Sequence, residues 1–206
     1  FLDPLMFGDY PSSMRERVGS GLPTFSRSEA SLLKGSLDFM GINHYTSFYA
    51  RHNKSIVIGT LLNDSISDFG AITLRKLPAN SIWLYIVPEG MRKLMNYIKQ
   101  KYNNPPVIIT ENGMDDPNCM FILIKNALKD EKRIRYHSGY LTNLLASIKE
   151  DGYNVNGYFF WSLLDNWEWG VGYTSRFGLY FVDYKDKLKR YPKNSVQWFK
   201  KFLTYV

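Results

Sequence analysis

Short apolar runs alternate with amphipathic segments along this chain, and the alternation limits the folds it can adopt. The runs lie at residues 37–42, 107–110 and 156–161. Between them lie a segment that opens at Pro88 and another at residues 131–151, both with apolar residues at helical spacing. Strands that alternate with helices pair in parallel, because each helix returns the chain to the start of the sheet. We therefore predict an α/β fold.

The two long helices have predicted buried faces. The first has apolar residues at i, i+3, i+4 and i+7, namely Met91, Leu94, Met95 and Ile98. For the second, the predicted buried stripe is Ile134, Leu141, Leu144, Leu145 and Ile148. Gly152 stands where a C-terminal cap belongs, which ends this helix near residue 151.

The remaining segments are predicted from turn and capping signals. Residues 1–25 are rich in Pro, Gly and Ser and are predicted to form a long loop. Ser26 to Glu29 form a capping box that opens a short helix to Gly35. Residues 50–80 are expected to be irregular, with one strand at 56–58. A hairpin strand at 178–182 precedes a last helix from Asn194, whose predicted buried residues are Val196, Trp198, Phe199 and Phe202.

Composition narrows the possible functions. The 206 residues suffice for one domain or a large piece of one. The formal charge of +7 is compatible with a protein that binds nucleic acid. Lys and Arg are scattered over predicted helix faces, however, which favours a solvated surface. One cysteine excludes an intrachain disulfide, and the 3 histidines lack metal-ligand spacing. We expect no metal, cofactor, nucleic acid or membrane partner, since no apolar run is long enough to span a bilayer.

Polar and aromatic residues follow each predicted strand at its C-terminal end. The run Val107-Ile108-Ile109-Thr110 ends in Glu111, and Asn112-Gly113 turn the chain away. Asn43 and Tyr45 follow the first strand, and Trp161 ends the third. In a parallel α/β barrel these ends share one mouth, where chemistry collects. A carboxylate held there by a tyrosine hydroxyl could act as a nucleophile.

Each of these residues also has a plainer explanation. A Glu before Asn-Gly is often a solvated turn residue, and Tyr45 could be a hydrogen-bonded core tyrosine. Trp161 could simply pack in a barrel, and Glu168 could anchor a loop. His137 is expected to be a surface or satisfied histidine. The sequence around Ser162 has no Gly-x-Ser-x-Gly elbow, so a serine nucleophile is not expected.

Several motifs in order resemble one enzyme family. Ile109-Thr110-Glu111-Asn112-Gly113 resembles the nucleophile signature of glycoside hydrolase family one, the β-glucosidase family, and Asn43-His44-Tyr45 is similar to its Asn-x-Tyr at the end of barrel strand six. The run from Trp161 to Trp169 resembles the strand-eight region. Asp3-Pro4-Leu5 and the run from Tyr191 to Ser195 resemble plant members in particular. The resemblance implies a partial (β/α)8 TIM barrel, with about the last three strands and their helices.

The resemblance also implies roles for individual residues. Glu111 would be the nucleophile of a retaining mechanism on β-D-glucosides, with Tyr45 hydrogen-bonded to it and Asn43 close by. The other substrate-binding residues would be Trp83 as aglycone platform, Trp161 under the glucose ring, Glu168 and Trp169 at the sugar hydroxyls, and Phe177 in the same pocket. His44 stands where tyrosine is more usual, and it is expected to point away from the ligand.

The resemblance leaves a large part of the barrel unaccounted for. Residues 1–206 would be the C-terminal portion of a single barrel domain, with strands one to five missing. A retaining glycosidase needs a second carboxyl group as acid and base, which the family carries in an Asn-Glu-Pro motif on strand four. The printed sequence contains no Asn-Glu-Pro. The chain alone is therefore expected to be inactive without the missing N-terminal barrel half.

Two questions stay open at this stage. The competing interpretation is a truncated, non-catalytic remnant or a weak sugar-binding module. The first residue is Phe1, so the chain is expected to be a processed product or a fragment. Sequons at Asn53 and Asn63, together with the family, favour a secretory route to the vacuole, apoplast or endoplasmic reticulum.

Overall fold

The computed structural model describes residues 2–52, 71–74 and 80–204. The chain divides into two compact units, Phe1–Phe39 with Phe48–Arg75, and Met40–Ser47 with Lys76–Val206. The strand predicted at 56–58 and the sequons at Asn53 and Asn63 lie outside the described residues.

The first unit contains short helices and one antiparallel strand pair. Its described elements are α1 (Leu2–Phe7), α2 (Ser12–Val18), the 3-10 turn η1 (Gly19–Gly21), α3 (Arg27–Leu33), β2 (Tyr49–His52) and β3 (Ala71–Leu74). The predicted capping box is confirmed, because Ser26 and Glu29 each accept the other's backbone N–H. The loop predicted for residues 1–25 is wrong. Gly8, at φ +83°, and Pro11 separate two helices there and do not prevent them.

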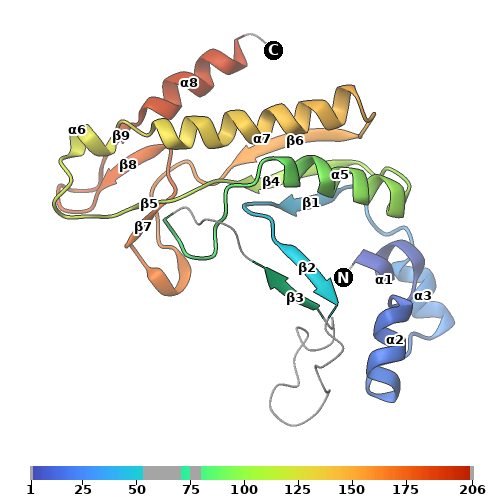
Figure 1. Cartoon of the computed structure of the whole chain (residues 1–206). Coiled ribbons are helices and arrows are strands. Elements are labelled where there is room, and N and C mark those ends of the chain that lie inside the picture. Colours follow the sequence, from blue (N-terminus) through green and yellow to red (C-terminus); the bar gives the residue numbers. More distant parts are fainter. Residues whose placement is uncertain (1, 53–70, 75–79, 205–206) are drawn as a thin grey trace. The chain divides into compact units, whose positions relative to one another are not determined.

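The second unit is built on a parallel three-stranded sheet. Its strands are β1 (Met40–Asn43), β4 (Val107–Asn112) and β6 (Val155–Phe160), in the order β1-β4-β6 (Figure 1). Both pairings are parallel, as the alternating pattern predicts. Val107 and Ile109 are fully buried, so the β-branched run of the central strand forms the middle of the core. The register of both pairings shifts near the C-terminal end of β4.

Two long helices connect these strands. α5 (Glu89–Tyr102) lies between β1 and β4 in the chain, α7 (Glu131–Lys149) lies between β4 and β6, and Figure 1 shows both running alongside the sheet. In α5 the predicted face is confirmed at Met91, Met95 and Ile98, which are buried. The short α6 (Ile124–Ala127) precedes α7.

The buried face of α7 differs from the predicted stripe. Leu144 is buried as predicted, but Leu145 is 54% exposed, and Ile134, Leu141 and Ile148 are not buried. The residues that face the core are Arg133, Tyr136, His137, Tyr140, Leu144 and Ser147. The reason is that polar atoms at the strand ends need hydrogen-bond partners, which tyrosine and arginine can supply and leucine cannot. Leu141, Leu145 and Ile148 instead line an apolar groove of about 640 Å³.

The C-terminal part returns along the end of the sheet. It contains β5 (Asp116–Pro117), the 3-10 turn η2 (Trp169–Val171), β7 (Ser175–Arg176), the hairpin β8 (Tyr180–Asp183) with β9 (Lys189–Pro192), and α8 (Asn194–Leu203). In α8, Val196 is buried and Phe199 packs on Phe160 with ring centroids 4.1 Å apart. Of the other residues predicted to be buried, Trp198 and Phe199 are only half-buried, and Phe202 is 36% exposed and lines the groove with Trp198.

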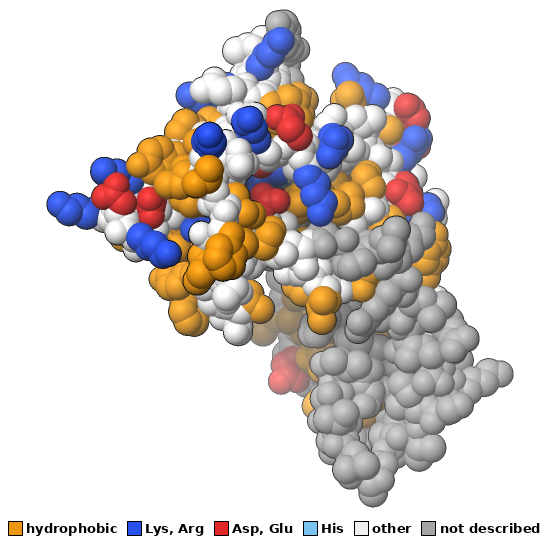
Figure 2. Space-filling view, turned by 60° about the vertical axis from the view of Figure 1, so that its left-hand side comes forward, with side chains coloured by type: hydrophobic (Ala, Val, Ile, Leu, Met, Phe, Trp, Pro, Cys, Tyr) orange, Lys and Arg blue, Asp and Glu red, His pale blue; other side chains and the backbone are white. Residues whose placement is uncertain are grey.

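The charged surface is mixed. On the face drawn in Figure 2, Lys and Arg side chains are dispersed among acidic and hydrophobic ones. This dispersal agrees with the solvated surface predicted from the sequence. Among the described residues, the structure contains no helix with the length and apolar character needed to span a bilayer.

Candidate active site

The site is built around a carboxylate and a phenol at the ends of neighbouring strands. Glu111 is the penultimate residue of β4, and Tyr45 follows β1 by two residues. The Tyr45 hydroxyl donates a hydrogen bond to Glu111 Oε2. The backbone N–H of His44 donates to the Glu111 carbonyl over 2.8 Å, which keeps the two strand ends together. Burial and the bond to Glu111 raise the pKa of Tyr45, so its hydroxyl stays a donor.

Two tyrosines of α7 fix the backbone at Tyr45, the partner of Glu111. The hydroxyls of Tyr136 and Tyr140 donate to the Tyr45 carbonyl over 2.7 and 3.2 Å. The Asn112 amide donates to the His44 carbonyl over 2.6 Å and to Tyr136 over 3.1 Å. Because all of these groups are buried, the backbone on both sides of the Tyr45–Glu111 contact has little freedom. The two tyrosines are spaced i, i+4 in the predicted helix, which was the available signal for their shared role.

A second part of the site is formed by the segment after β6. Trp161 Nε1 donates to Glu168 Oε1 over 3.3 Å. Glu168 is only 6% exposed, and burial raises the pKa of its carboxyl group, with the charges of Asp115 and Glu111 adding to the effect. The backbone after β4 passes close to the Trp161 backbone at Gly113. A glycine is needed there, because a Cβ on Gly113 would lie 1.9 Å from the Trp161 carbonyl oxygen.

Aromatic rings connect the two parts. The Tyr45 ring meets Trp83 and Phe177 edge-on, at centroid distances of 5.8 and 5.9 Å. A pocket of about 290 Å³ opens beside these rings, lined by Ser81, Trp83, Glu168, Trp169, Gly170, Val171, Ser175 and Phe177. The groove of about 640 Å³ beside α7 contains none of the predicted site residues, whereas the pocket of about 290 Å³ is lined by Trp83, Glu168, Trp169 and Phe177.

The structure thus brings most of the predicted site residues together. Asn43 Oδ1 accepts a hydrogen bond from Thr110 over 2.6 Å, one residue ahead of Glu111. Trp169 lines the pocket but is 86% exposed. His44 is buried against Tyr140 at 5.6 Å, which agrees with its expected orientation away from the site. Burial lowers the pKa of His44 to about 4.

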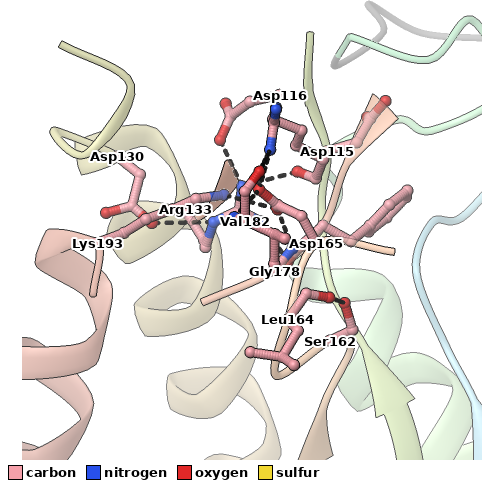
Figure 3. Close-up of polar contacts among 12 residues, drawn as sticks. Asp115, Asp116, Asp130, Arg133, Ser162, Leu164, Asp165, Gly178, Val182 and Lys193 are labelled. Carbon is pink, nitrogen blue, oxygen red and sulfur yellow. Dashed lines mark hydrogen bonds and ion pairs between the residues drawn. The ribbon is translucent and has the colours of Figure 1, made fainter. Parts of the chain in front are cut away.

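A buried polar cluster supports the wall that carries Phe177. Figure 3 shows Asp116, Asp130, Arg133, Asp165 and Lys193 directed toward one another. Arg133 donates to Asp130 over 3.0 Å and to the Phe177 carbonyl over 3.0 Å. Asp165 accepts from Arg176 over 2.5 Å, and from Lys193 over 3.1 Å. Sequence reasoning did not identify this cluster, because Asp165 and Lys193 stand in motifs that carry no sign of the other's position, 28 residues away in the chain.

In the part of the chain that the structure describes, no group of three or more His, Cys, Asp or Glu side chains is arranged to hold a metal ion. His137 is buried and its Nδ1 lies 3.0 Å from the Tyr158 hydroxyl, so it is a structural histidine.

Comparison with known proteins places these features in context. The model of glycosyl hydrolase family 1 matches residues 1–205. β-Glucosidase 40 of Arabidopsis thaliana is 70% identical over 210 residues, which cover 98% of this chain and 41% of the relative. β-Glucosidase 6 of Oryza sativa subsp. japonica is 67% identical, with 98% and 40% covered. The chain therefore spans about two fifths of the length of these relatives.

Solved structures of β-glucosidases have the same fold over the length of this chain. A mutant rice β-glucosidase in a covalent complex with Glc superposes with a TM-score of 0.93 at 67% identity, over 97% of this chain and 43% of that one. A β-glucosidase of the fungus Humicola insolens in complex with glucose gives a TM-score of 0.90 at 37% identity, over 100% and 44%. The fold of this chain is thus similar to part of a larger molecule.

Proposed function

This chain belongs to glycosyl hydrolase family 1, and we propose that it is the C-terminal part of a retaining β-glucosidase that acts on β-D-glucosides. One observation carries the proposal, namely the hydrogen bond from Tyr45 to Glu111 at the ends of neighbouring parallel strands. A phenol donor orients the carboxylate and leaves its second oxygen, Oε1, available for attack on an anomeric carbon.

The proposed reaction has two displacements. Glu111 attacks the anomeric carbon, the glycosidic C–O bond breaks, and the departing oxygen takes a proton from a general acid. Water, deprotonated by the same group, then attacks the glucosyl ester and releases Glu111. In retaining enzymes the two carboxyl groups lie about 5–5.5 Å apart. The second carboxyl group would come from the part of the barrel that this chain does not contain.

The remaining predicted residues would bind the sugar and its leaving group. Glu168, held by Trp161, would accept hydrogen bonds from two hydroxyls of glucose, next to Trp169. Trp161 would lie under the ring. Phe177 would close the pocket, Asn43 would add a polar contact, and Trp83 would support the aglycone. The ring contacts of Tyr45 with Trp83 and Phe177 support this arrangement, because they connect the nucleophile to the pocket.

The proposal includes a missing partner segment. We propose that residues 1–206 are the last three strands of a (β/α)8 barrel, within a single barrel domain whose strands one to five lie ahead. The share of the relatives covered, about two fifths, supports this. Among the described residues, β1 and β6 each pair only with β4, so each has an edge without a strand. Phe159 of β6 is 60% exposed, and closure of the barrel would cover it.

The test uses a completed barrel, in which this chain follows the part of Arabidopsis β-glucosidase 40 that precedes the matched residues. Aryl β-glucoside hydrolysis is measured for this fusion, its Glu111→Gln variant and the chain alone. A 2-deoxy-2-fluoroglucoside should label the fusion on the peptide that contains Glu111. We expect hydrolysis and labelling only in the unsubstituted fusion. An active fusion labelled on another residue, or turnover retained in E111Q, would overturn the assigned role of Glu111.

A further inference from the structure

Asp115 connects two sides of the pocket of about 290 Å³, the wall that carries Trp83 and the wall that carries Phe177, but does not itself line the pocket. It follows β4 by three residues and its side chain is fully buried. Asp115 Oδ1 accepts from the Ser81 backbone N–H over 3.1 Å. Oδ2 accepts from Asn80 Nδ2 over 2.8 Å, Ser81 Oγ over 2.6 Å and Ser175 Oγ over 2.7 Å. Four donors converging on one carboxylate form a strong, charge-assisted anchor.

The charge of Asp115 is stabilised where it lies. Burial opposes ionisation, but the hydrogen bonds from Ser81, Ser175 and Asn80 outweigh it and lower the pKa of Asp115. The lowered pKa favours the ionised carboxylate, which can accept from all four donors. An asparagine at this position would instead turn an NH₂ group toward these donors.

The two serines that donate to Asp115 each stand two residues before an aromatic residue of the pocket. Ser81 precedes Trp83, and the Leu84 N–H donates to the Ser81 carbonyl over 3.1 Å, so Trp83 lies inside a turn that starts at Ser81. Ser175 precedes Phe177 in the same way. All four residues line the pocket of about 290 Å³. Asp115 thus ties the Trp83 turn to β7, which Phe177 directly follows.

The two walls differ in how else they are held. The Phe177 carbonyl accepts from the buried Arg133, so this wall keeps an anchor without Asp115. Trp83 is 45% exposed, and its carbonyl and N–H have no such link to Arg133. On the far side from Asp115, the Trp83 turn is held by the Tyr85 N–H, which donates to Thr46 Oγ1 over 2.8 Å, and by the edge contact of the Trp83 ring with Tyr45. The Tyr45–Glu111 pair is held separately, by Tyr136 and Tyr140. Loss of the Asp115 anchor would therefore free the Ser81 end of the Trp83 turn and shift the indole, and it would leave the nucleophile in place.

From this asymmetry we propose that Asp115 is a positioning residue that determines aglycone binding by fixing Trp83 across the pocket from Phe177. The inference rests on the proposed function, because it takes Trp83 to be the aglycone platform. Asp115 itself does not touch the substrate. Its effect should appear for ligands that carry an aromatic aglycone and be nearly absent for glucose alone.

The experiment measures binding by calorimetry in the completed barrel for two ligands, glucose and an aryl β-thioglucoside that resists hydrolysis. In Asp115→Asn we expect the dissociation constant of the thioglucoside to rise about tenfold and that of glucose to change less than about twofold, the size expected from one or two lost hydrogen bonds. Asp151→Asn is the matched control. Asp151 also accepts several hydrogen bonds, from Arg92 and Asn96, and contacts no residue of the pocket. It should leave both constants unchanged.

A double-mutant cycle tests whether Asp115 acts through Trp83. In a Trp83→Ala background, D115N should add no further loss of thioglucoside affinity. If D115N does not fold, Ser81→Ala keeps the carboxylate, removes one donor, and should show the same selectivity with a smaller effect. An equal rise for both ligands, no rise for either, or additive losses with W83A would overturn the proposal. Failure of the proposed function has a different signature, because the unsubstituted fusion would then neither hydrolyse glucosides nor form a Glu111 adduct.

Discussion

Substitution of Arg133 by methionine should destabilise the protein more than any change at a surface ion pair. Arg133 is fully buried and its guanidinium donates to Asp130, to Asp116 and to the carbonyls of Met114, Arg176 and Phe177 (Figure 3). Methionine fills a similar volume but offers no donor. The substitution thus isolates the loss of charge and hydrogen bonds from the loss of packing.

The magnitude follows from what is left behind. Breaking a buried ion pair by removing one partner costs about 3–5 kcal/mol, because the other charge stays buried without compensation. Asp130 keeps its bonds from the Ser195 N–H and hydroxyl, and Asp116 is 32% exposed, so water can reach it. Both facts reduce the cost, but the buried carbonyls of Met114, Arg176 and Phe177 also lose a donor, so the expected loss for Arg133→Met is about 3–5 kcal/mol.

Equilibrium unfolding in urea of the completed barrel measures this loss. Arg92→Met is the matched control, because Arg92 also pairs with two carboxylates but is 34% exposed. It should cost about 0–1 kcal/mol. If the free energies of unfolding of R133M and R92M differ by less than about 1 kcal/mol, the expected difference between buried and exposed ion pairs is absent. That result would contradict a supporting role of the cluster for the segment that carries Phe177.

Three further predictions concern the site and its surroundings. Tyr45→Phe removes the donor to Glu111. In stopped-flow assays of the completed barrel, the rate of glucosylation should fall about 10–100-fold, which corresponds to the loss of one hydrogen bond to a charged group. An unchanged rate would contradict the role of Tyr45. Burial raises the pKa of Glu168, so the unfolded state ionises first and stability is lost as pH rises from 4.5 through the folded pKa. Glu168→Gln should therefore raise the melting temperature at pH 7 but not at pH 4, while weakening glucose binding; a lower melting temperature at pH 7 would refute this. Burial lowers the pKa of His44 from 6.5 to about 4, so stability is lost as pH falls through that interval. His44→Phe should flatten the acid side of the stability curve by about 1.4 kcal/mol per pH unit, and parallel curves for the two proteins would show that His44 is not the group responsible.

Strand and helix positions in the second unit follow closely from local patterns. The run Val107-Ile108-Ile109 is apolar and β-branched, which is typical of a strand covered on both faces of a parallel sheet. The capping box at Ser26 also forms as predicted, because it needs only residues three apart. By contrast, Pro and Gly in residues 1–25 mark helix ends there, although their frequency alone suggests a loop.

The face of α7 shows where local patterns fail. Spacing of Leu141, Leu145 and Ile148 predicts a buried stripe, but the helix turns Tyr136, Tyr140 and Arg133 inward. The periodicity of apolar residues reflects only the free energy gained by burying apolar side chains. It carries no information on the hydrogen bonds that carbonyl groups at strand ends require. Those carbonyls, such as that of Tyr45, become neighbours of α7 only after the chain has folded.

The sequence by itself determined the chemical types at the strand ends and their order. Glu111, Tyr45 and the Trp161–Glu168 segment could be identified because motif spacing and strand termination are local properties of the chain. Only the tertiary structure decided which groups meet: that Tyr45 donates to Glu111, that Asp115 joins the Trp83 turn to β7, and that Arg133 holds the Phe177 carbonyl. Such contacts join residues 34 to 66 positions apart. Their partners are chosen by burial and donor–acceptor matching in three dimensions, for which no local pattern is a substitute.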